Sequence, residues 1–163
     1  MSSAVFSTVV DSPVGALTIV ASDAGVRAVL WPDDDPSRVR LPDSLDDPSH
    51  PVIAAAVAQL DEYFAGTRTT FDVPLDPVGT EFQRAAWDAL RTIPYGVTVS
   101  YGDQADRMGD RRKARAVGAA NGRNPISIIV PCHRVVGANG SLTGFAGGVD
   151  TKAWLLAHEQ PAP

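Results

Sequence analysis

The sequence has one cysteine among its 163 residues, and it has no apolar run of about 18 residues. A single cysteine cannot form a disulfide within the chain, and it cannot build a cysteine-rich zinc site. The absence of a long apolar run excludes a membrane-spanning helix, and the N-terminal residues lack the basic segment of a signal peptide. We therefore expect a protein of the cytoplasm, where thiols stay reduced, with no membrane partner.

Basic residues are scarce in the first half of the chain. Residues 1–79 carry 4 Lys and Arg against 12 Asp and Glu, a balance of −8, whereas residues 80–163 carry 10 against 7, a balance of +3. The net charge of −5 for the whole chain hides this difference. Such an asymmetry favours a polyanion as the partner of the second half. The alternative is that acidic loops merely fall in the first half.

Three short segments near the N-terminus are rich in β-branched residues and are separated by turn signals. They are residues 4–10, 16–22 and 26–31. Their partial alternation predicts an antiparallel sheet. Proline and aspartate dominate residues 32–51, which predicts an exposed loop.

A helix is predicted over residues 51–66, where apolar side chains recur at spacings of four. The residues expected to face the core are Val52, Ala56, Leu60 and Phe64. Residues 69–80 then look like an extended connection into a second unit.

Helices dominate the prediction for the second half. Thr80 and Gln83 stand at the spacing of a capping box, which predicts a helix start. Ser100 is a candidate cap for a short helix that ends at Gly109, and another helix follows almost at once. Two short helices joined by a tight turn fit a helix-turn-helix, and a plain helical hairpin is the commoner alternative.

The second helix of this pair has one face that is nearly bare of side chains. Ala114 and Val117 can face a core, while an adjacent face carries Arg115, Gly118, Ala119 and Gly122. Glycine in a helix costs about 1 kcal/mol relative to alanine, so the close approach of another surface is expected. That surface is a neighbouring helix or a DNA groove. With so few long polar side chains, the helix would read DNA backbone and shape rather than base edges.

Cys132 follows an apolar run at residues 126–130, which predicts a buried strand ended by Pro131. A lone buried cysteine is usually inert. His133 changes this expectation, since an imidazole can take the thiol proton directly or through a water molecule. Glu159 lies one turn beyond Leu155 near the apolar stripe of the last helix, at the end where the helix dipole disfavours an anion. A partner such as His133 would offset this penalty, and a solvated helix end is the alternative.

These motifs together resemble the O6-alkylguanine-DNA alkyltransferase family. The resemblance rests on Pro-Cys-His-Arg-Val at residues 131–135, on "NP" before it, and on "LTGFAGG" and "WLLAHE" after it. It is strong over residues 80–160 and looser over the N-terminal half. It implies an α+β fold with a ribonuclease H-like N-terminal domain, an antiparallel sheet with a helix, over residues 1–76. A mostly helical helix-turn-helix domain, winged-helix-like, would occupy residues 77–163.

The resemblance also implies a reaction. Cys132 would accept the alkyl group of O6-alkylguanine in DNA, with O4-alkylthymine as a second candidate substrate, and the protein would act once. His133 would take a proton through a water molecule and Glu159 would hold the imidazole. Asn124 would fix the active-site turn, and Tyr101 would donate its hydroxyl to the leaving base. The displacement needs no metal and no cofactor.

The same resemblance implies a duplex in contact with the second helix through its minor groove, with little sequence specificity, and a monomer in solution. Arg115 would enter the duplex. The other expected DNA contacts are Ala114, Gly118, Ala119, Gly122 and Arg123. The expected pocket residues are Tyr101, Val130, Pro131, Phe145, Ala146 and Gly147. Phe145 and Ala146 depart from the tyrosine and serine found in some family members, which bears on how the leaving oxygen is held.

Three other functions compete with alkyl transfer. A non-catalytic sensor of alkylated DNA resembles this family but replaces the cysteine, so Cys132 argues against it. A papain-like hydrolase would turn over many times, and the surroundings of its cysteine are absent here. A helix-turn-helix regulator with an idle cysteine is the last alternative.

Overall fold

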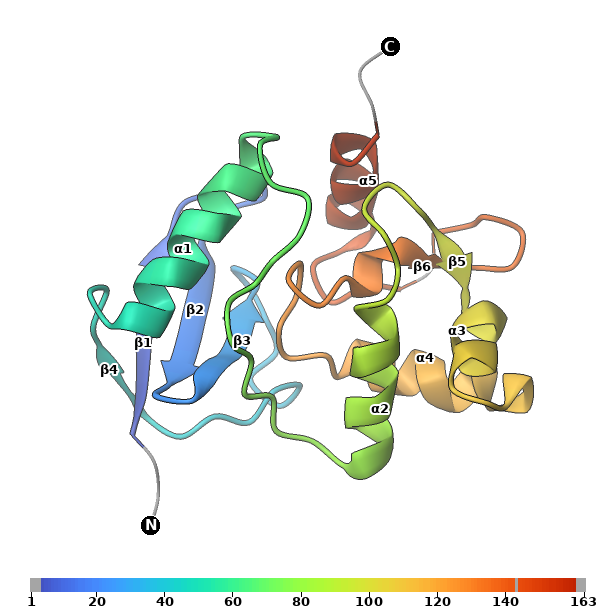
Figure 1. Cartoon of the computed structure of the whole chain (residues 1–163), viewed down its shortest axis with the longest axis horizontal. Helices are drawn as coiled ribbons and strands as arrows, with labels where there is room; N and C mark the ends of the chain where they lie inside the picture. The colour runs from blue at the N-terminus through green and yellow to red at the C-terminus, as the bar shows by residue number, and fades with distance from the viewer. Residues whose placement is uncertain (1–3, 143, 161–163) are drawn as a thin grey trace. The chain divides into compact units, whose positions relative to one another are not determined.

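The computed structural model describes residues 4–142 and 144–160, and the chain forms two compact units, Met1–Val78 and Gly79–Pro163 (Figure 1). The first unit is a sheet with one helix, and the second is mainly helical. The predicted α+β class is therefore confirmed. Within the described residues, no helix is both long and apolar enough to cross a membrane.

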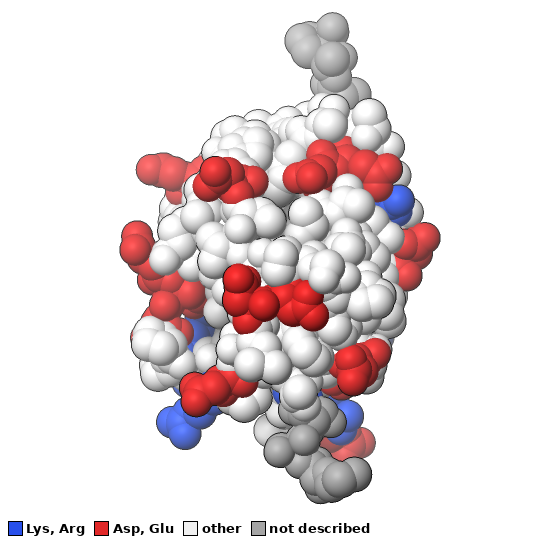
Figure 2. All heavy atoms as spheres, turned by 90° about the vertical axis from the view of Figure 1, so that its left-hand side faces the viewer, with Lys and Arg blue, Asp and Glu red and all other residues white. Residues whose placement is uncertain are grey.

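A four-stranded sheet forms the N-terminal unit, in the order β3-β2-β1-β4. Its first three strands are β1 (Val5–Val10), β2 (Leu17–Ser22) and β3 (Gly25–Leu30). They pair antiparallel as a meander, as the β-branched segments predict. The face of the molecule on which β1, β4 and helix α1 lie carries many Asp and Glu side chains and few basic ones (Figure 2). This face is poorly suited to a polyanion.

The prediction of a loop over residues 32–51 is wrong in part. Strand β4 (Ser44–Asp46) lies within it and pairs parallel with β1. Val39 and Leu41, from the same segment, pack against a buried cluster on the sheet. The strand is three exposed residues long, so it has no apolar alternation by which a sequence pattern could show it.

Helix α1 (Pro51–Phe64) packs against the sheet, chiefly on β2 (Figure 1). The predicted buried face is only half right, because Val52 and Phe64 are half-buried. The apolar residues that are buried are Ile53, Ala56, Leu60 and Tyr63. Strict spacings of four drift by roughly 40° per step around a helix of 3.6 residues per turn, so they leave the core-facing stripe.

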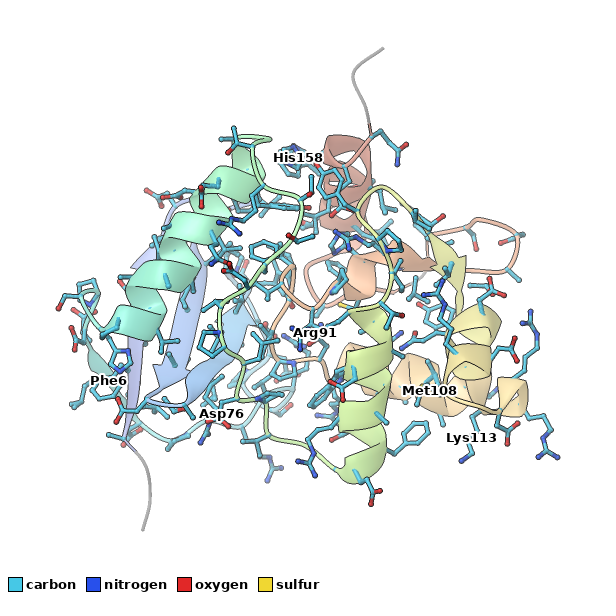
Figure 3. The ribbon with its side chains drawn as sticks, viewed as in Figure 1. Phe6, Asp76, Arg91, Met108, Lys113 and His158 are labelled. Atoms are coloured by element: carbon cyan, nitrogen blue, oxygen red, sulfur yellow. The ribbon has the colours of Figure 1, made fainter. Side chains whose placement is uncertain are left out.

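The segment after α1 is extended, as predicted, and it joins the sheet edge. Val26 of β3 donates its N–H to the carbonyl of Pro74 and accepts from the N–H of Asp76. Asp76, labelled in Figure 3, also accepts hydrogen bonds from Ser22 Oγ at 2.6 Å and Arg27 Nε at 2.9 Å. These bonds keep the connection on the N-terminal unit.

Helices α2, α3 and α4 form the core of the C-terminal unit and contact one another (Figure 1). The helices are α2 (Glu81–Leu90), α3 (Tyr101–Arg107), α4 (Ala114–Gly122) and α5 (Val149–His158), with short 3-10 turns η1 (Arg111–Lys113) and η2 (Cys132–Arg134). Strands β5 (Val99–Ser100) and β6 (Val135–Val136) pair in parallel.

The predicted helix starts are confirmed by their side-chain caps. Thr80 and Gln83 form the reciprocal capping box of α2, and Ser100 and Asp103 form a second one at α3. Each box satisfies two N–H groups that a helix start leaves without a helical partner. Helices α3 and α4 follow one another in the chain, joined by the 3-10 turn η1, as the helix-turn-helix prediction requires.

Candidate active site

The segment before Cys132 is a set of turns, which corrects the prediction of a strand over residues 126–130. Its residues are buried, but Ile128 has φ of +71°. Such a conformation is rare for a β-branched residue, and the surrounding structure must hold it. Asn124 supplies two of the holding bonds. Its Nδ2 donates to the carbonyl of Val130 at 2.9 Å, and its Oδ1 accepts from the N–H of Ile126 at 3.1 Å.

Cys132 begins the 3-10 turn η2 and therefore does not stand at a strand end. Its side chain is buried, with 8% of the residue exposed. Its N–H donates to the carbonyl of Val130 at 2.9 Å, the same carbonyl that Asn124 binds. The Asn124 turn thus reaches the cysteine through one shared acceptor.

A buried hydrogen-bonded network lies directly after the cysteine. Nε2 of His133 is 2.7 Å from Oε2 of Glu159, and the two residues are 0% and 2% exposed. The predicted pairing of this histidine with this glutamate is confirmed. The solvated helix end that was the alternative for Glu159 is wrong. Arg134 joins them, donating from Nε to Oε1 at 2.8 Å and from Nη2 to Oε2 at 3.1 Å.

The charges in this network follow from burial and hydrogen bonding. Burial alone would raise the pKa of Glu159, but hydrogen bonds and charges from His133 and Arg134 lower it to about 2. Burial lowers the pKa of His133; Glu159 opposes this shift, and the charges of Arg134 and Lys152 add to it. At neutral pH, Glu159 is therefore an anion that only accepts, and His133 is neutral.

The neutral histidine must carry its proton on Nε2, because that nitrogen faces an acceptor-only carboxylate. Its other ring nitrogen is then a base. In the part of the chain that the structure describes, no side chain or backbone group hydrogen-bonds Nδ1 of His133. The arrangement fixes an unprotonated imidazole nitrogen on the residue that follows the buried Cys132 in the chain.

Lys152 is a second buried basic residue of this region, and the sequence analysis did not identify it. It is 1% exposed, and its Nζ donates to the carbonyl of Val135 at 2.6 Å. Burial lowers the pKa of its ammonium group, and the charge interaction with Cys132 opposes that shift. An ammonium near the sulfur favours the thiolate form of the cysteine. Arg134 was missed in the same way.

The predicted DNA-contacting residues lie along α4. Arg115, Ala119, Gly122 and Arg123 are exposed, and Ala114 is half-buried. A Cβ added at Gly122 would meet no atom within 4 Å, so this part of the face is open.

Gly118 differs from its neighbours on that face, because a side chain lies over it. A Cβ added there would lie 3.6 Å from Cδ1 of Tyr101. Tyr101 is the first residue of α3 and is half-buried. The structure therefore brings this predicted site tyrosine against α4.

The remaining predicted pocket residues differ in burial. Val130 and Pro131 are buried, Phe145 and Gly147 are half-buried, and Ala146 is exposed. Gly148 adopts φ of +93° and donates its N–H to the carbonyl of Phe145, which closes a turn. Lys152 Nζ lies 5.8 Å from the centre of the Phe145 ring. Thr143, in the same glycine-rich segment, lies outside the described residues.

A separate groove of about 730 Å³ opens between α2 and α3. Its lining includes Phe82, Ala89, Met108 and Lys113, and Figure 3 shows the last two beside α2. None of the predicted site residues lines it. Residues 4–142 and 144–160 contain no group of three or more His, Cys, Asp or Glu that could hold a metal ion.

Two family descriptions match the chain, one for each unit. Residues 5–77 match "6-O-methylguanine DNA methyltransferase, ribonuclease-like domain", and residues 81–161 match "6-O-methylguanine DNA methyltransferase, DNA binding domain".

The similarity to known proteins covers nearly the whole chain. A methylated-DNA–protein-cysteine methyltransferase of Mycolicibacterium paratuberculosis is 50% identical over 153 residues, which is 93% of this chain and 90% of that protein. One of Methanosarcina acetivorans is 45% identical over 94% of this chain and 97% of that protein. The crystal structure of Mycobacterium tuberculosis OGT in complex with DNA has a TM-score of 0.87 and 48% identity, covering 94% of this chain and 92% of that one. The chain belongs to the methylated-DNA–protein-cysteine methyltransferase family.

Proposed function

We propose that this chain repairs DNA by moving the alkyl group of O6-alkylguanine onto Sγ of its own Cys132. The observation that carries the proposal is the buried network of His133, Glu159 and Arg134 directly after this cysteine, in a chain of this family. O4-alkylthymine remains a second candidate substrate.

The reaction is an in-line displacement at a saturated carbon. The thiolate of Cys132 attacks that carbon, so an S–C bond forms while the bond from carbon to O6 breaks, and the electron pair of the broken bond returns to the purine. The thiol proton passes through a water molecule to Nδ1 of His133, and Glu159 stabilises the imidazolium that results. Tyr101 donates a hydrogen bond from its hydroxyl to the leaving base. The base takes up a proton from water, and the imidazolium of His133 returns the thiol proton to water, so no net proton is gained or lost.

One charged neighbour of Cys132 supports the thiolate form. The ammonium of Lys152 interacts with Cys132 and favours the anion. Asn124 holds the turn on which the sulfur stands, through the carbonyl of Val130. The product is a thioether, which water does not hydrolyse readily. Each molecule therefore acts once, with no metal and no cofactor.

The open face of α4 is the proposed DNA surface. Arg115, Ala119 and Gly122 are exposed there, and a helix with short side chains can enter a narrow minor groove. The alkylated base must leave the stack to reach Cys132, and Arg115 would take its place. The pocket for that base would be formed by Tyr101, Val130, Pro131, Phe145, Ala146 and Gly147.

The remaining proposals concern organisation. We keep the ribonuclease H-like domain at residues 1–76 and the winged-helix-like, DNA-binding domain at residues 77–163. We place the protein in the cytoplasm as a monomer that binds duplex DNA with little sequence specificity. The +3 charge balance of residues 80–163, against −8 for residues 1–79, supports the assignment of DNA to the second domain.

Mass spectrometry of the protein after incubation with an O6-methylguanine oligonucleotide tests the function. The peptide that contains Cys132 should gain one methyl group in place of its thiol hydrogen, and Cys132→Ala should gain none while still binding the duplex. A protein that binds the oligonucleotide with no mass change would be a sensor of damage. Product in large excess over protein would indicate a hydrolase.

A further inference from the structure

Arg134 makes more hydrogen bonds to Glu159 than His133 does. Its Nε and Nη2 bind the two carboxylate oxygens at 2.8 and 3.1 Å, and its Nη1 donates to the carbonyl of Ile93 at 2.7 Å. Its guanidinium also lies over the Tyr95 ring, 5.7 Å from the ring centre. The residue is only 6% exposed. These contacts hold its guanidinium in place within the C-terminal unit.

The two hydrogen bonds from Nε and Nη2 of Arg134 to the Glu159 carboxylate form a fork, and this fork determines how Glu159 can approach the histidine. A guanidinium that binds both carboxylate oxygens fixes the plane of the carboxylate. Oε2 then accepts from Arg134 and His133 at once, and its contact with His133 Nε2 is 2.7 Å. If the Glu159 carboxylate could rotate, Oε2 would not stay in place as the acceptor for Nε2 of His133. The imidazole proton could then move between Nε2 and Nδ1.

The charge of Arg134 acts on the same imidazole. The charged groups that act on His133 are Glu159 and Lys152 from α5 and its end, and Arg134 from η2. Tyr95, in the loop after α2, faces Glu159 and Arg134, and Cys132 precedes His133 in the chain. Among the residues that the structure describes, Glu159 favours the imidazolium, while burial and the charges of Arg134 and Lys152 oppose it. A neutral base is needed for the proton of Cys132. Burial is the main cause of the lowered pKa of His133, and the charge of Arg134 adds to it.

We propose that Arg134 is a positioning residue of the transfer reaction: its fork on Glu159 holds His133 as the neutral Nε2–H tautomer, with Nδ1 as the base. The inference rests on the proposed alkyl transfer at Cys132, and it assigns Arg134 a part in catalysis beyond filling the core.

The pH dependence of the transfer rate tests the charge of Arg134. The substrate is O6-methylguanine as the free base, so that DNA binding does not enter, and the acid limb of the profile reports the base. Arg134→Gln removes the charge, which should raise the acid midpoint by about 1 pH unit. Arg134→Lys keeps a charge and loses the fork, so the rate should fall by about tenfold with the midpoint unchanged.

The matched control is Arg38→Gln in the N-terminal unit. Arg38 makes the same kind of fork, with its Nε and Nη2 at 2.7 and 2.6 Å from the Asp34 carboxylate, and both side chains are nearly buried. This variant should lose stability as Arg134→Gln does, with no change in rate or midpoint. A midpoint that moves in the control as well would assign the effect to general destabilisation and overturn the proposal.

Nitrogen NMR of His133 provides a readout that does not depend on transfer. The wild type at neutral pH should show a protonated Nε2 and a bare Nδ1, and Arg134→Lys should show exchange between both tautomers. If Arg134→Gln does not fold, Arg134→Lys decides: a wild-type rate and a single tautomer there would refute the role. If the wild-type protein transfers no methyl group, the proposed function itself is refuted.

Discussion

Replacing Glu159 by Gln should be the most damaging single charge removal in the C-terminal unit. The side chain is 2% exposed, and its pKa is lowered from 4.5 to about 2. A shift of that size corresponds to roughly 3 kcal/mol at neutral pH. Loss of one partner from a buried ion pair costs about 3–5 kcal/mol, since Arg134 would keep an uncompensated charge. We expect the free energy of unfolding at pH 7 to fall by about 3 kcal/mol.

Urea denaturation of Glu159→Gln, followed by tryptophan fluorescence, measures this loss. The control is Glu62→Gln, because Glu62 is 49% exposed and pairs with Arg68 at 3.1 Å. Such a surface pair contributes about 0–1 kcal/mol. A carboxyl group whose folded pKa is lowered stabilises above its unfolded pKa and loses that contribution as pH falls toward the folded pKa. The part of the gap between wild type and Glu159→Gln that comes from the Glu159 carboxyl group should therefore be lost as the pH falls from 4.5 to about 2. The reasoning would be refuted if the free energy of unfolding fell by less than 1 kcal/mol at pH 7, or if the difference between the two proteins did not change in acid.

Three further predictions concern α4 and its contact with α3. Gly122→Ala should stabilise the protein by about 0.5–1 kcal/mol, since the added Cβ meets no atom within 4 Å. The same variant should bind duplex DNA more weakly in a titration. An unchanged affinity would show that this face of α4 does not contact DNA. Gln104→Leu should lower the free energy of unfolding by about 1–3 kcal/mol in urea denaturation. The reason is that the side-chain amides of Gln104 and Asn121 form two buried hydrogen bonds with each other, at 3.0 and 2.7 Å. Adding Asn121→Leu should recover most of that loss, and full additivity would contradict the coupling. Arg115→Ala should slow repair in a duplex more than transfer from the free base, and an equal decrease in both rates would make Arg115 structural.

The fold was predictable where side chains have a repeating pattern or a local partner. The β-branched segments predicted the meander. Thr80, by its capping-box spacing to Gln83, and Ser100, as a cap, predicted two helix starts. Strand β4 could not be predicted, because its three exposed residues are held by pairing with β1 alone. A buried apolar run at residues 126–130 looks like a strand, but the Asn124 side chain bonds its backbone into turns instead.

The site was predictable to the extent that its residues are unusual for their places in the sequence. An anion at the end of a helix, on the buried stripe, required a partner, and that argument linked Glu159 to His133. Arg134 and Lys152 were missed because arginine and lysine are almost never fully buried without partners, and no local pattern marks either of them as buried. The carbonyls of Ile93 and Val135, which bind them, come from other segments and are invisible to a local pattern.

The number and position of methyl groups transferred test the central claim most directly. With O6-methylguanine oligonucleotide in excess, we predict that each protein molecule restores one guanine and carries one methyl group, on Sγ of Cys132. Several guanines restored per molecule, or a methyl group found on any other residue, would contradict the account.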